Sequence, residues 1–169
     1  MVDSFRALTS LRATRWFTDE VVREAALRAV LETARWTGSA RNRQPWRFHT
    51  SRNAATREEL SRCGAYAAHL RSAPVVLLLA LDRSWDDAEF DGGRVAQNIM
   101  LAAHQLGLAS CPVTFFPQRN AERATAIGGF AAPWQVRTGI ALGHPAPKPA
   151  GRSAIPTGRH PLETLWTAD

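Results

Sequence analysis

The sequence predicts an α+β protein, and three features of the 169-residue chain carry that prediction. Residues 75–81 (VVLLLAL) form an uninterrupted apolar run, which is typical of a strand buried on both faces of a sheet. Residues 90–106 are apolar almost all round at helical spacing, so we expect this helix in the centre of the core. Helical and strand patterns alternate irregularly, which favours α+β over a regular doubly wound sheet. The length is typical of a single domain, taken as residues 1–169.

The other elements follow from apolar periodicity, capping residues and turn residues. Helices are expected where apolar residues recur every three or four positions, and strands where apolar and polar residues alternate. Thr18, Asp19 and Glu20 are interpreted as the start of the second helix, because a hydroxyl and two acids favour a helix N-terminus. The expected order is a helix over 3–11, a loop over 11–17, a helix over 22–34, a loop over 38–45, a strand over 46–50, helices over 56–63 and 65–72, the strand 75–81, the helix 90–106, a strand over 110–116, a helix over 121–128 and a strand over 136–142.

The C-terminal part of the chain reads as an extended arm. Residues 145–151 (PAPKPAG) contain three prolines and cannot be helical, and residues 161–166 have strand or short-helix character. Leu162, Leu165 and Trp166 would be left in water by a free arm. We therefore expect the arm over 145–169 to cover its own domain or a partner subunit.

Charge and composition exclude several classes of protein. The net charge is +6, and the basic residues are arginines apart from Lys148. These arginines are spread along the chain without a run of five, and no zinc-finger spacing or aromatic RNA-binding motif accompanies them, so nucleic-acid binding is not expected. Two cysteines cannot form a disulfide scaffold, and no apolar run has the length of a bilayer span. The first residues lack a secretory-signal pattern, so a soluble, cytoplasmic protein with no membrane association is expected.

No side-chain constellation for catalysis is evident in the sequence. The five histidines are not spaced as metal ligands, and no phosphate-binding glycine loop or nucleophile elbow is present. Cys63 and Cys111 lack a CxxC context and are interpreted as buried thiols. We therefore expect no metal site and no catalytic side chain. An enzyme built this way relies on a bound cofactor for its chemistry.

Three separated segments carry a family resemblance. They are residues 11–17 (LRATRWF), 38–48 (GSARNRQPWRF) and 91–113, which begins DGGRVAQNIM and ends ASCPV. Residues 141–146 and 159–162 add a matching closing pattern. In this order the segments resemble the FMN-dependent nitroreductase family, and the resemblance covers nearly the whole chain.

The resemblance implies a fold, a cofactor and an assembly. The fold is a central, mainly antiparallel sheet flanked by helices, built as an intertwined homodimer with two FMN sites at the dimer interface. The C-terminal arm, residues 145–169, crosses onto the other subunit. The implied activity passes a hydride from NADH or NADPH to the flavin, and then to a small-molecule acceptor such as a nitroaromatic or a quinone.

The resemblance also implies roles for particular residues. In the first segment, Arg12 holds the FMN phosphate by bidentate hydrogen bonds, and Arg15 approaches the pyrimidine edge, where a cation stabilises the reduced flavin. Ala13 stands where the family usually has serine, so one phosphate contact is either lost or made by a backbone N–H. Beside Cys111 and Pro112, the strand residues Val113 and Thr114 face the flavin.

The second segment and the C-terminus complete the implied site. Ser39, Ala40, Asn42 and Gln44 match the loop that reaches the flavin from the neighbouring subunit. Turn formation before Pro45 is the alternative role for Asn42 and Gln44. Arg159 matches a basic position that closes on the phosphate, and its alternative role is packing beside the apolar residues that follow it.

The chain departs from the family pattern at three places. Residues 64–69 lack the usual polar or cationic side chains before the apolar strand, which leaves Tyr66, His69 or Arg71 as substitutes. Thr114 is followed by Phe115 and Phe116, so we expect bulky groups near the flavin face. The connection over 81–91 is short, so we expect an open, shallow pocket or weak FMN retention.

Two further functions stay open at the sequence level. One is a flavin-dependent dehydrogenase or oxidase of a peptide or a cyclised amino-acid product, which passes electrons to oxygen. The other is a catalytically degenerate member that serves as a binding module, which Ala13, residues 65–68 and Phe115 would favour.

Overall fold

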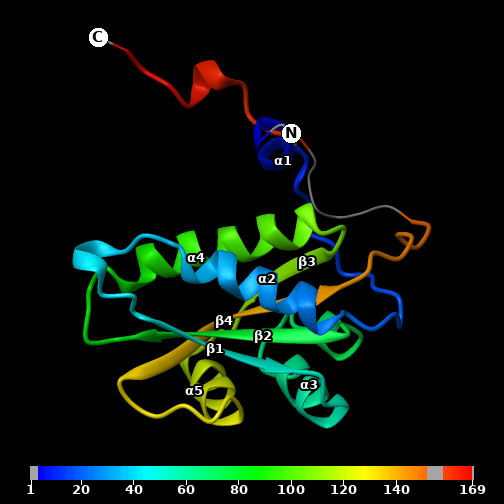
Figure 1. Cartoon of the computed structure of the whole chain (residues 1–169), viewed down its shortest axis with the longest axis vertical. Coiled ribbons are helices and arrows are strands. Elements are labelled where there is room, and N and C mark those ends of the chain that lie inside the picture. The colour runs from blue at the N-terminus through cyan, green and yellow to red at the C-terminus, as the bar shows by residue number, and fades with distance from the viewer. Residues whose placement is uncertain (1–3, 152–157, 169) are drawn as a thin grey trace.

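The computed structural model describes residues 4–151 and 158–168, and these form one antiparallel sheet with helices on both faces (Figure 1). The sheet has four strands in the order β1-β2-β4-β3, and every neighbouring pair is antiparallel. The α+β prediction is therefore confirmed. The strands are β1 Trp46–Ser51, β2 Val75–Asp82, β3 Ala109–Thr114 and β4 Trp134–Gly143. The helices are α1 Ser4–Ser10, α2 Glu24–Arg35, α3 Ala54–Ser61, α4 Ala88–Gln105 and α5 Gln118–Ile127, with short 3-10 turns at Ala40–Asn42, Ala68–Arg71 and Leu162–Thr164.

The central strand β2 divides the core into two layers. Leu77 and Leu79 pack toward α2 and α4, whereas Leu78 and Ala80 pack toward α3 and α5. Figure 1 shows the same arrangement, with α2 and α4 on one face of the sheet and α3 and α5 on the other. Each residue from Val75 to Leu81 is buried, which confirms that a strand without polar alternation is covered on both faces.

Helix α4 differs from the expected fully enclosed helix. Val95, Ile99 and Ala103 face the sheet and α2 and are fully buried. Its other side lies at the surface of the single chain, where the Phe90 side chain is 72% exposed. An apolar helix with one uncovered side needs a further surface to bury it.

Helix α2 begins later than predicted. It starts at Glu24, and the preceding Arg23 makes no side-chain capping bond. The Thr18 N–H instead donates to the His144 carbonyl (3.0 Å), because residues 13–18 run alongside the sheet. The predicted helix over 65–72 is likewise reduced to the 3-10 turn Ala68–Arg71. Among the described helices, none is long and apolar enough to span a membrane.

Candidate functional site

Residues 12–18 lie between the start of β3 and the segment that follows β4. The Thr14 N–H donates to the Ser110 carbonyl (2.9 Å), and Ala13 pairs with Ser110 as an isolated parallel bridge. On the other side, the Ala146 N–H donates to the Trp16 carbonyl (3.1 Å). These long-range bonds place the predicted residues Arg12, Ala13 and Arg15 along the edge strand β3.

A depression of about 340 Å³ opens at this junction. Arg12 lines it, and both of its hydrogen bonds within the described chain use Nη1, which donates to the Thr9 and Leu11 carbonyls at 2.7 Å. These bonds orient the guanidinium and leave Nε and Nη2 for a ligand. Ser110 also lines the depression, and its side-chain Oγ is fully buried without a hydrogen-bond partner in the described structure.

A buried hydroxyl without a partner is costly, so a group that hydrogen-bonds to Ser110 stabilises the site. The neighbouring Arg12 guanidinium is a donor whose geometry matches the oxygens of a phosphate. The Arg12 guanidinium therefore suits a phosphate-bearing ligand at this depression, which Ser110 also lines. The depression is at the small end of the usual range for a small-molecule pocket.

Arg15 lies farther along β3, close to His69 and Cys111. Burial lowers the pKa of His69, the positive charge of Arg15 lowers it further, and backbone groups of Tyr66 and Cys111 oppose the shift. Nδ1 of His69 is 3.1 Å from the Tyr66 carbonyl, whereas the buried Nε2 has no hydrogen-bond partner in the described structure. Of the three substitutes that the sequence left open, His69 is the one with an unpartnered buried nitrogen beside Arg15.

Because its pKa is lowered on folding, His69 makes stability depend on pH. The neutral His69 ring makes its full contribution to the stability of the fold above a pH of about 6.5, the pKa expected for this residue in the unfolded chain. This contribution is lost as the pH falls through the lower pKa that His69 has in the folded protein. We expect thermal unfolding between pH 7 and 5 to be less acid-sensitive in His69→Asn than in the wild type. His160→Asn, in an exposed segment, serves as the control. Identical profiles for the wild type and His69→Asn would contradict the prediction.

Both cysteine predictions are confirmed. Cys63 and Cys111 are free and buried. Burial raises the pKa of both thiols, so neither is an activated nucleophile. Among the described residues, no cluster of three histidine, cysteine or acidic side chains can hold a metal ion.

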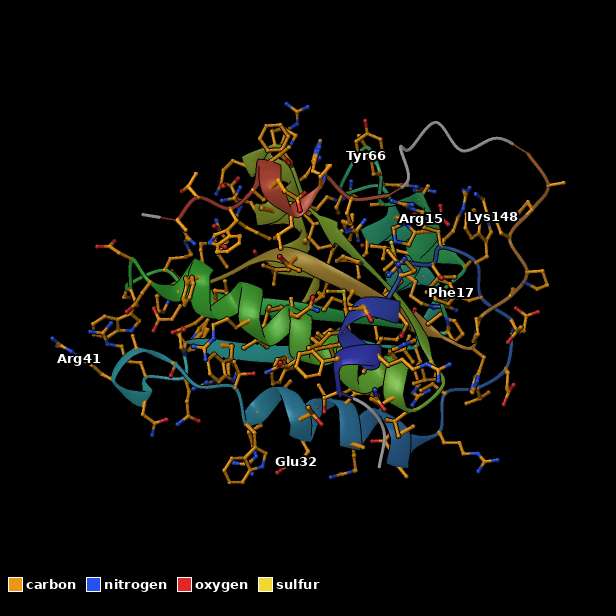
Figure 2. The ribbon with its side chains drawn as sticks, turned by 90° about the horizontal axis from the view of Figure 1, so that it is seen from above. Arg15, Phe17, Glu32, Arg41, Tyr66 and Lys148 are labelled. Atoms are coloured by element: carbon orange, nitrogen blue, oxygen red, sulfur yellow. The ribbon has the colours of Figure 1, made fainter. Side chains whose placement is uncertain are left out.

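The second predicted segment lies at the opposite end of α4. The Ala40 N–H donates to Oδ2 of Asp91 (3.1 Å) near the start of α4, whereas His104, near its end, contacts the Ser10 hydroxyl (2.8 Å) beside the depression. Asp91 and His104 are roughly 20 Å apart along the helix axis. Figure 2 likewise shows Arg15 at one end of the molecule and Arg41 at the other. A single chain therefore does not bring Ser39, Ala40, Asn42 and Gln44 to the depression.

The expectation that Phe115 is a bulky group near the flavin face is wrong, as the end of β3 shows. Val113 is buried, Thr114 is exposed at the end of this edge strand, and Phe116 is 67% exposed. Phe115 is fully buried on the α3 and α5 side of the sheet, where a Cβ on Gly139 would lie 2.8 Å from its ring. Phe115 is therefore a core residue and does not obstruct a ligand site.

Arg159 lies outside this arrangement. It is exposed, its Nη1 donates to the Gly158 carbonyl (2.7 Å), and the described segment 158–168 extends away from the sheet (Figure 1). Within one chain the structure does not bring Arg159 to Arg12.

Several residues of the site were not singled out from the sequence. Ser110 stands between apolar neighbours in a strand, which is a signal that its hydroxyl needs a partner. Asp91, a carboxylate next to Gly92 and Gly93 that is buried in the fold, is a similar signal, since a buried charge requires donors. By periodicity alone, Ser110 is an ordinary residue of a strand and Asp91 an ordinary residue of a helix.

The fold and the site together define an antiparallel α+β protein with a cationic, phosphate-compatible depression at an edge strand. The model of the Nitroreductase family matches residues 8–64 and 59–144, and the chain belongs to this family.

Three similar proteins match nearly the full length of the chain. An NADH dehydrogenase from Thermus thermophilus is 28% identical over 206 residues, covering 98% of this chain and 97% of the relative. A protein from Methanothermobacter thermautotrophicus assigned as an NADH dehydrogenase/NAD(P)H nitroreductase is 29% identical over 170 residues, covering 96% of this chain and 87% of the relative. A nitroreductase-type protein from Desulfovibrio desulfuricans, solved in complex with FMN, superposes with a TM-score of 0.82 at 28% identity, covering 100% of this chain and 98% of that one.

Proposed function

We propose that this protein is an FMN-dependent oxidoreductase that takes a hydride from NADH or NADPH and reduces a nitroaromatic, a quinone or a similar oxidised acceptor. Family membership, the NADH-linked relatives and the FMN-bound structure at 28% identity support the proposal. The observation that carries it is the depression where the oriented Arg12 guanidinium lies with the unpartnered Ser110 hydroxyl.

The side chains of this site have separate roles in the proposal. Arg12 and Ser110 hold the phosphate, and the Ala13 backbone replaces the serine side chain that the family usually has there. Bound FMN supplies the hydride-transfer chemistry. Arg15 places a fixed positive charge at the pyrimidine edge, where a cation favours added electron density. His69, neutral above its lowered pKa, is a neighbouring polar group that adds no second charge.

The proposal includes a homodimer with the flavin sites at its interface. In one chain, the loop with Ser39 and Gln44 lies far from Arg12, so a second chain is needed to bring the two predicted segments together. Exposed apolar groups support such an interface: Leu8 on α1 and Leu106 after α4, and Leu162, Leu165 and Trp166 in the arm, each between 46% and 70% exposed. In this assembly the arm over 145–169 contacts the partner subunit and brings Arg159 to a phosphate.

The test is the identity of the bound chromophore, followed by turnover. The purified protein should release about one FMN per chain on denaturation, and it should oxidise NADH or NADPH when a quinone or a nitroaromatic is present. A colourless protein that also does not bind added FMN would contradict the proposal and favour a catalytically degenerate family member that serves as a binding module. Substrate-dependent peroxide formation without NAD(P)H would favour the dehydrogenase of a peptide or a cyclised amino-acid product.

A further inference from the structure

Polar residues along one side of α4 and at its N-cap hold the loop over 37–44. They recur at intervals of four, three and four positions, so they share one side of the helix. We call Asp87, Asp91, Arg94 and Asn98 the α4 stripe. Each member contacts the loop, in reverse chain order: Asp87 with Arg43 (3.1 Å), Asp91 with the Ala40 N–H (3.1 Å), Arg94 with the Gly38 carbonyl (2.8 Å) and Asn98 with the Thr37 hydroxyl (2.7 Å).

The loop that the α4 stripe holds has an unusual backbone. Arg41, Asn42 and Gln44 have φ values of 52°, 54° and 51°, and they are the non-glycine residues with positive φ in the described chain. L-residues rarely adopt this conformation, and it persists where the surroundings impose it. Within the loop, the Asn42 N–H donates to the Ser39 carbonyl (3.0 Å) and the Gln44 N–H to the Ser39 hydroxyl (2.9 Å).

Asp91 is the buried member of the α4 stripe that ties the loop to the helix. Its side chain is 3% exposed, against 37% for Asp87 and 47% for Arg94. One carboxylate oxygen accepts from Ala40 and the other from Arg94 (3.3 Å). Both bonds are charge-assisted, so they are stronger than neutral hydrogen bonds. Arg94 in turn donates to Gly38, so Asp91 fixes the loop on both sides of Ser39.

We infer that Asp91 is a positioning residue of the flavin site, which acts through the Ala40 N–H to hold Ser39, Asn42 and Gln44 in their bound conformation before flavin arrives. The inference rests on the proposed function, in which this loop meets the flavin of the other subunit. Preorganisation lowers the conformational entropy lost on binding, so releasing the loop weakens the affinity for FMN. Asp91 itself touches no reacting atom.

The test combines hydrogen exchange with FMN titration of the full-length protein. Asp91→Ala should speed exchange at the Asn42 and Gln44 amides, which are bonded to Ser39 and not to Asp91. It should also weaken FMN binding about tenfold, the loss expected for a hydrogen bond to a charged group. Asp91→Asn should lie between Asp91→Ala and the wild type in both amide exchange and FMN affinity, since an amide oxygen still accepts from the Ala40 N–H. If Asp91→Ala does not fold, Asp91→Asn decides, with a smaller effect expected on both readouts.

The control is Glu58→Ala on α3, which removes an exposed carboxylate paired with Arg62 (2.9 Å) and should change neither readout. Unchanged exchange at Asn42 and Gln44 in the Asp91 variants would overturn the inference, because the loop would then hold itself. Faster exchange with unchanged FMN affinity would also overturn it and would leave the proposed function standing. A wild-type protein that binds no FMN would instead overturn the proposed function and the flavin part of this inference.

Discussion

Replacing Phe115 by alanine should lower the free energy of unfolding by about 3–5 kcal/mol, the cost typical of deleting a buried aromatic ring. The ring is fully buried and fills the space over Gly139, so its removal leaves a cavity on the α3 and α5 side of the sheet. Urea unfolding at fixed protein and FMN concentrations measures the effect, because a bound ligand or partner shifts apparent stability.

The adjacent Phe116 is the matched control. Its side chain is 67% exposed, so Phe116→Ala should change stability by no more than about 0.5 kcal/mol. Equal losses in the two variants would contradict the assignment of Phe115 to the core. If Phe115→Ala had wild-type stability but reduced an electron acceptor at an altered rate, Phe115 would instead belong to the ligand site.

Replacing Arg12 by alanine should weaken FMN binding by about 10- to 100-fold, since charge-assisted bonds to a phosphate contribute about 1.5–3 kcal/mol. Arg12→Lys should lie between the wild type and Arg12→Ala, because an ammonium keeps the charge but not the planar fork. The measurement is fluorescence titration of FMN into protein freed of flavin.

Arg28→Ala is the control for the Arg12 variants. Arg28 is 81% exposed on α2 and pairs with Glu24 (3.7 Å), so its loss removes one positive charge without touching the depression. Equal FMN affinities in Arg12→Ala and Arg28→Ala would remove Arg12 from the phosphate site. Arg43 is unsuitable for this purpose, because it holds the loop through Asp87 and lies 3.9 Å over the Trp85 ring.

The predictions that succeeded rest on short-range patterns. The apolar run over 75–81 places β2 between two layers, and an isolated cysteine in an apolar context is buried, because both follow from the cost of exposing apolar groups. The irregular alternation of helices and strands identifies the α+β class in the same way. The family resemblance also points to Arg12 and Arg15, which no periodicity argument would select, and their roles at the flavin stay predictions.

The predictions that failed depend on partners far along the chain. Thr18 looks like a helix cap, but its hydroxyl accepts from the Glu20 N–H (3.3 Å) in a local turn while its own N–H ties the chain to the His144 carbonyl, and α2 starts only at Glu24. Phe115 looks like a residue at the site, but the missing side chain at Gly139 gives its ring a place in the core. A local pattern does not contain these pairings, because they join segments separated by more than twenty residues.

The sequence by itself determined the fold class, the double-sided burial of β2 and the burial of both cysteines, because each follows from local periodicity or residue type. Only the tertiary structure decided which polar groups lie near one another: Arg12 and Ser110 line one depression, the charge of Arg15 lies near His69, and the Asp91 carboxylate accepts from the Ala40 N–H. The physical reason is that these groups belong to segments far apart in the sequence, so only folding brings them close enough to interact, and no local pattern records which group each one will meet.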